Sequence, residues 1–61
     1  MNVTEKSRLE REQHGLEVEM GFWQEQQYET EDEFYWHYTA GRIQALAEKI
    51  DQIRRKLEEV K

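Results

Sequence analysis

Two Glu–His pairs are the residues of this chain whose types and spacing suggest chemistry. Glu10 and His14, and again Glu33 and His37, stand four residues apart, which on a helix places both members of a pair on one face. Carboxylate-bridged di-iron bundles use a Glu and a His three residues apart, with further Glu residues from facing helices. A metal-binding helical bundle is therefore one alternative, with Glu33 and His37 as its candidate ligands. The spacing of four favours a solvated His beside a Glu instead, and we expect no metal or cofactor.

The usual catalytic arrangements are missing from the sequence. The chain has no Cys, its one Ser is Ser7 among charged neighbours, and its three Gly residues are isolated. The sequence therefore indicates neither a Cys-type zinc site, nor a Ser nucleophile with its base, nor a glycine-rich phosphate loop. We expect a non-enzyme. The absence of Cys also fits the reducing cytoplasm, where we expect the protein to act.

A basic segment near the C-terminus suggests a second alternative, a hairpin dimer that binds nucleic acid. Arg54, Arg55 and Lys56 are adjacent, but acidic residues interrupt the segment and no aromatic residue accompanies it. The formal net charge of −5 also disfavours binding to phosphates. We therefore expect no nucleic-acid partner.

The length of the chain limits what it can stabilise alone. Its 61 residues form one domain at most, 1–61. Below about 70 to 80 residues a core rarely supplies more than roughly 3 to 5 kcal/mol, so such chains need a staple or a partner. With 38% charged residues and no Pro, the composition is typical of long helices and coiled coils. No apolar run approaches the roughly 20 residues of a membrane-spanning helix. We expect no membrane association, and a homodimer or a higher oligomer.

Apolar residues recur at helical spacing along two segments. The first stripe contains Leu9, Leu16, Met20 and Trp23. The second is a heptad seam that continues to the C-terminus. Its members are Trp36, Ile43, Leu46, Ile50, Ile53, Leu57 and Val60. Each stripe predicts a helix that buries one narrow face.

A turn near residue 30 brings the two stripes together. Thr30 and Glu33 form a capping box, which predicts that the second helix begins near residue 31. If the chain folds back at this point, large residues of one stripe lie opposite residues of the other. The two residue numbers of each facing pair then add up to 62 or 63. The pairs are Val3 with Val60, Leu9 with Ile53, Leu16 with Leu46, Met20 with Ile43, and Trp23 with Thr39. The sequence therefore predicts an all-α, coiled-coil-like antiparallel hairpin with helices at about 3–28 and 31–60.

We expect two such hairpins to assemble into a four-helix bundle. The second helix carries a fuller seam than the first can cover, since the first offers Lys6, Gln13 and Gln27 at facing positions. The predicted oligomer core contains Leu16, Met20, Trp23, Trp36, Ile43, Leu46, Ile50, Ile53 and Leu57. In this interpretation, the uncovered side of Ile50, Ile53 and Leu57 must find another helix.

An α-β-β-α fold with a β-hairpin at about 16–39 remains an alternative. Residues 16–22 alternate between apolar and other residues with period two, and residues 34–39 are rich in strand formers. Gly15 would then end a short first helix. Against this fold, the Gln- and Glu-rich connection at 23–33 prefers helix.

The aromatic residues give the strongest indication of function. All seven lie within residues 22–38, inside a longer run, 12–41, that holds eight acidic residues and no Lys or Arg. Exposed aromatic residues are favoured at protein interfaces. We therefore expect a small interaction module, an adaptor, assembly factor or inhibitor, whose acidic, aromatic-rich end binds a protein with a basic surface. The predicted contact residues are Phe22, Phe34, Tyr35, Tyr38, Glu31 and Asp32. In the simpler alternative this end serves self-association alone.

Overall fold

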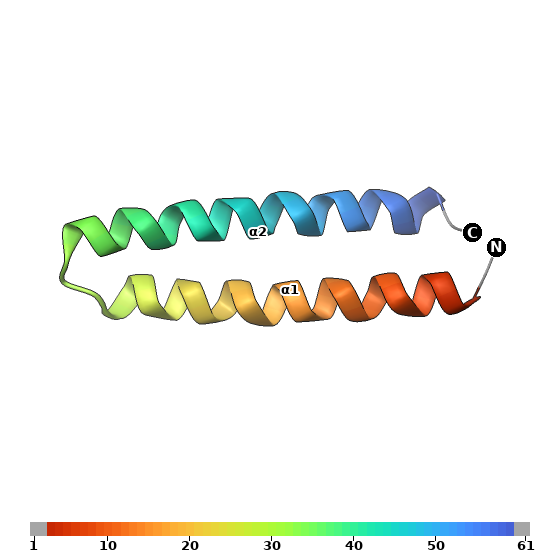
Figure 1. Ribbon diagram of the computed structural model, residues 1–61, viewed down its shortest axis with the longest axis horizontal. Coiled ribbons are helices and arrows are strands. Elements are labelled where there is room, and N and C mark those ends of the chain that lie inside the picture. Colours follow the sequence, from red (N-terminus) through yellow and green to blue (C-terminus); the bar gives the residue numbers. More distant parts are fainter. Residues whose placement is uncertain (1–2, 60–61) are drawn as a thin grey trace.

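The computed structural model describes residues 3–59 and shows two antiparallel helices joined by a short turn (Figure 1). Helix α1 spans Val3–Glu29 and helix α2 spans Glu33–Glu59, each 27 residues long. The molecule measures 47 × 14 × 10 Å. The predicted all-α hairpin is confirmed. The predicted contact between Val3 and Val60 lies outside the described residues, because Val60 and the side chain of Val3 are not among them.

The alternative with a β-hairpin at about 16–39 is wrong. Both proposed strands lie within helices, and Gly15 continues α1 with a negative φ. Leu16 and Met20 are half-buried, whereas Val18 and Phe22 are exposed, so burial follows the helical period and not the alternation. A Gly inside a helix costs about 1 kcal/mol relative to Ala, and packing of α1 along α2 offsets this cost.

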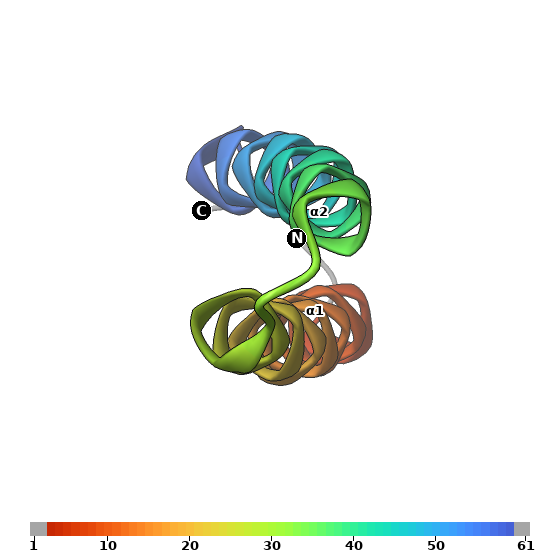
Figure 2. The same cartoon turned by 90° about the vertical axis from the view of Figure 1, so that its left-hand side faces the viewer.

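One narrow seam holds the helices together. The buried apolar side chains among the described residues are Leu9, Leu46, Ile50 and Ile53, and Thr39, nearer the turn, is fully buried. Thr39 fits there because its hydroxyl donates a hydrogen bond of 2.7 Å to the carbonyl oxygen of Trp36. The end-on view in Figure 2 shows that the two helices form a single layer.

Contacts across the seam confirm the predicted register. Glu19 is joined to Arg42, and Gln26 is joined to Tyr35. In each pair the two residue numbers add up to 61, within two of the predicted 62 or 63.

The reason given for assembly into a bundle is wrong in one respect. Ile50 and Ile53 do not present an uncovered side, since they are only 5% and 6% exposed within the single hairpin. Leu57 is half-buried. Half-buried Gln13 shows how α1 helps to cover them, because the methylene groups of an amide side chain pack well against apolar residues. Self-association therefore needs another surface.

The turn differs from the predicted capping box. Helix α2 begins at Glu33 instead of 31, and its cap is Asp32. The Oδ1 atom of Asp32 accepts hydrogen bonds from the backbone N–H groups of Phe34, at 2.9 Å, and Tyr35, at 3.3 Å. Thr30 instead accepts from the N–H of Asp32 at 3.1 Å, which stabilises the turn and not the helix.

This assignment predicts that Asp32→Ala destabilises the hairpin more than Glu33→Ala. Loss of an N-cap side chain costs about 1 kcal/mol, because helix N–H groups lose their acceptor. Urea unfolding followed by circular dichroism, with both variants at the same protein concentration, measures the difference. A larger loss of stability for Glu33→Ala would contradict this assignment and favour the capping box of Thr30 and Glu33.

Candidate interaction surfaces

The fold distributes the seven aromatic residues over different sides of the hairpin. Trp23 is half-buried between the helices, and Tyr38 is 55% exposed next to it. Trp36 is 44% exposed, and Phe34 at the tip is 87% exposed. The crowding of aromatics in the sequence therefore becomes several separate surfaces in the structure.

Four rings form what we call the aromatic cluster: Phe22, Trp23, Tyr35 and Tyr38. Trp23 contacts Phe22 at a ring centroid distance of 5.3 Å and Tyr38 at 5.7 Å, both edge to face. Tyr38 stacks on Tyr35 at 6.0 Å. These distances lie in the favourable range for aromatic pairs. The cluster thus connects α1 to α2 and leaves Phe22 and Tyr38 open to a partner.

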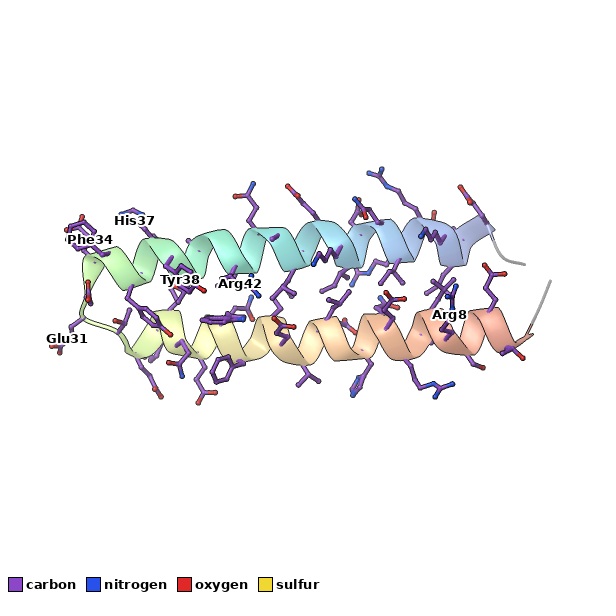
Figure 3. All side chains as sticks on the ribbon, viewed as in Figure 1. Arg8, Glu31, Phe34, His37, Tyr38 and Arg42 are labelled. Atoms are coloured by element: carbon purple, nitrogen blue, oxygen red, sulfur yellow. The ribbon has the colours of Figure 1, made fainter. Side chains whose placement is uncertain are left out.

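A single cation borders the aromatic cluster. The guanidinium carbon of Arg42 lies 5.5 Å from the centroid of the Trp23 ring. The same group donates a hydrogen bond of 3.3 Å to the Oε2 atom of Glu19. Figure 3 shows Tyr38 and Arg42 close together between the two ribbons. Because Glu19 already pairs with Arg42, this cation does not offset the acidic charge at the tip.

The remaining residues of the predicted binding surface lie at the tip of the hairpin. Glu31, Asp32 and Phe34 are all exposed, and Figure 3 shows Glu31 and Phe34 projecting from the end of the molecule. Tyr35 is half-buried, and its hydroxyl lies 3.5 Å from the Oε1 atom of Gln26. The structure therefore places the six predicted contact residues at one end, with Tyr35 acting mainly within the aromatic cluster.

Trp36 does not lie in the seam of the hairpin as the heptad pattern predicted. It is 44% exposed, and its ring contacts that of His37 at 5.3 Å. A straight α-helix drifts by about 20° per heptad, so three heptads separate Trp36 from Leu57 by about 60° around the helix. Trp36 instead stands on the flank of the seam, beside half-buried Ala40. Its place in an oligomer core remains a prediction.

Neither His residue has the surroundings of a metal site. His14 and His37 are exposed, and His14 lies near the middle of α1 whereas His37 lies near the start of α2. Figure 3 shows His37 pointing away from α1. Within residues 3–59, no group of three or more His, Asp or Glu residues is placed to hold a metal ion. Over the same residues there is no pocket, and neither helix has the length and apolarity to cross a membrane.

The chain matches no protein-family model, and no curated protein or solved structure is significantly similar to it. Its function is therefore argued from the surfaces described above.

Tyr38 and Phe34 are expected to differ in what they do for stability. Tyr38→Ala removes contacts with Trp23 and Tyr35 and should lower the free energy of unfolding by about 1 kcal/mol. Phe34→Ala should change it by less than about 0.5 kcal/mol, because that side chain is 87% exposed. Urea unfolding of both variants measures the difference. Equal losses would show that Phe34 contributes to the fold.

Proposed function

We propose that this chain is a small, non-enzymatic interaction module that self-associates and binds another protein through its acidic, aromatic tip. The observation that carries the proposal is the exposure of Phe22, Phe34 and Tyr38 at the end of the molecule where acidic residues are concentrated. An adaptor, an assembly factor or an inhibitor would each use such a surface.

Physical arguments favour a partner with an apolar pocket rimmed by Lys and Arg. Large exposed aromatic side chains supply most of the binding energy at protein interfaces. Opposite charges accelerate the encounter, and complementary charges exclude other partners. Residues 12–41 hold eight acidic residues and no Lys or Arg, so the complementary surface of the proposed partner carries positive charge.

Self-association is supported by the thinness of the fold. The hairpin is a single layer of two helices whose shortest dimension is 10 Å. Chains below about 70 to 80 residues rarely build a sufficient core without a staple or a partner. A cytoplasmic location is part of the proposal and rests on the absence of Cys.

Photo-crosslinking in cells of the native host tests partner binding. A benzoylphenylalanine replaces Phe34, which is 87% exposed and makes no ring contact within the described residues. We expect a crosslinked product that contains a second, different protein, and mass spectrometry identifies it. Because acidic residues surround the site, the yield should fall as salt is raised in lysate.

The matched control places the same photoreactive residue at Ala45, which is exposed midway along α2 and about 16 Å along the helix from position 34. We expect no crosslink to the same protein from that position. If position 34 crosslinks only to further copies of this chain, the tip serves self-association and the proposed partner does not exist.

A further inference from the structure

We propose that a second copy of the chain covers the flank of the hairpin that carries Trp36, with the two α2 helices antiparallel, so that Trp36 of each copy packs against Arg54 of the other. This inference rests on the self-association in the proposed function and identifies its surface. We call this flank the Trp36 face. It consists of Trp36, Ala40, Ile43 and Ala47 on α2, with Met20 and Gln24 on α1.

The Trp36 face is free of charged side chains over its centre. Its α2 residues follow one another at intervals of four, three and four, so they form one stripe along the helix. Trp36 and Ala47 are exposed, and Ile43 is half-buried. The opposite flank holds the ion pair between Arg42 and Glu19. That flank also carries the aromatic cluster, but interface cores are depleted of charge, so the Trp36 face is the better surface for a second copy.

The surface area of the hairpin leaves room for such a contact. The chain exposes 5011 Å². A compact monomer of this mass, 7.5 kDa, would expose only about 4,200 Å². The difference reflects the single-layer shape, and Figure 2 shows both flanks of the layer open. The small side chains of Ala40 and Ala47 permit a neighbouring helix to approach closely.

Helix geometry determines which residues meet. Trp36 and Arg54 are 18 residues apart, which is about five turns, so they lie on the same side of α2 and about 27 Å from each other. With a two-fold axis near residue 45, position 36 of one copy faces position 54 of the other, and position 43 faces position 47. In a two-fold interface each contact between two different positions occurs twice, once from each copy. The hairpin already contains the same kind of pair, Arg42 over Trp23 at 5.5 Å.

The distribution of charge selects the antiparallel arrangement. The tip carries Glu29, Glu31, Asp32 and Glu33, whereas the open end carries basic residues from both helices. These are Lys6, Arg8 and Arg11 on α1 and Arg54, Arg55 and Lys56 on α2, and six acidic residues at the same end (Glu5, Glu10, Glu12, Asp51, Glu58 and Glu59) leave it close to neutral. An antiparallel pair places the acidic tip of one copy beside the nearly neutral open end of the other, where Arg54 can meet Trp36. A parallel pair would place two acidic tips together, which costs free energy.

Ala47→Glu tests which flank is covered, with Ala45→Glu as the matched control. Both alanines are exposed on α2 and two residues apart. A Glu at 45 would pair with Lys49 and a Glu at 47 would face Asp51, but such pairs change helix stability by only about 0.2 to 0.5 kcal/mol each, less than the tenfold effect expected on the dimer. Sedimentation equilibrium should show a dimer for the native chain and for Ala45→Glu. For Ala47→Glu, the dimer dissociation constant should rise about tenfold or more, because a carboxylate would be buried without a partner. A native monomer at micromolar concentration, equal effects of the two changes, or a larger effect of Ala45→Glu would each overturn the proposal.

A double-mutant cycle tests the orientation and does not depend on Ala47. Trp36→Ala and Arg54→Ala should each weaken the dimer severalfold, and the double variant should lose clearly less affinity than the sum of the two single losses. The two positions are about 27 Å apart within one chain and cannot touch there. Coupling between them therefore requires a second, antiparallel copy. Additive effects, with the helix content of all variants intact by circular dichroism, would overturn the arrangement.

Phe34→Ala separates this inference from partner binding at the tip. Phe34 lies off the Trp36 face, so the variant should dimerise like the native chain while losing the partner. If Ala47→Glu is monomeric and still crosslinks to the partner from position 34, the two surfaces act independently. A dimer that dissociates on Phe34→Ala would overturn the assignment of self-association to the Trp36 face.

Discussion

Every surface of this protein depends on the narrow seam between α1 and α2. In proteins most helical stability comes from packing of an apolar face and not from intrinsic helix propensity. That face contains few buried apolar side chains, with Leu9 near the open end and Leu46, Ile50 and Ile53 along α2. The seam also sets the rotation of each helix. Once it is formed, the residues that point to either flank are determined.

The division of the aromatic residues follows from this rotation. Trp23 is the ring that the seam accommodates between the helices, opposite the small buried side chain of Thr39. Because Tyr38 directly precedes the buried Thr39, its side chain projects on one flank of the seam. The side chain of Trp36 projects on the other flank. There is no pocket within residues 3–59, and the residues of both proposed interfaces lie on the exposed flanks and tip of the hairpin.

Most of the fold could be predicted from the sequence, because periodicity and register are properties of the chain alone. The two stripes predicted both helices and their alignment. The turn could not be predicted as well. Thr30 and Asp32 both offer side-chain oxygens, and the backbone path of the turn decides that Asp32 caps α2. Trp36 was misplaced because a heptad count ignores the drift of a straight helix, which accumulates to about 60° over three heptads. The exposure of the tip was predicted correctly, since no stripe could bury Phe34.

Folding also changes the meaning of the charge pattern. Along the chain, residues 1–41 carry ten acidic and three basic residues, while residues 42–61 carry four and six. The hairpin brings the three basic residues of the first segment, Lys6, Arg8 and Arg11, to the same end as Arg54, Arg55 and Lys56, where six acidic residues balance their charge. A difference between two halves of the sequence thus becomes a difference between two ends of a molecule 47 Å long. The ends are separated by several times the Debye length of about 8 Å at physiological salt, so each acts on its neighbours independently. The tip keeps a net negative charge while the open end is close to neutral, and both follow from the position of a single turn.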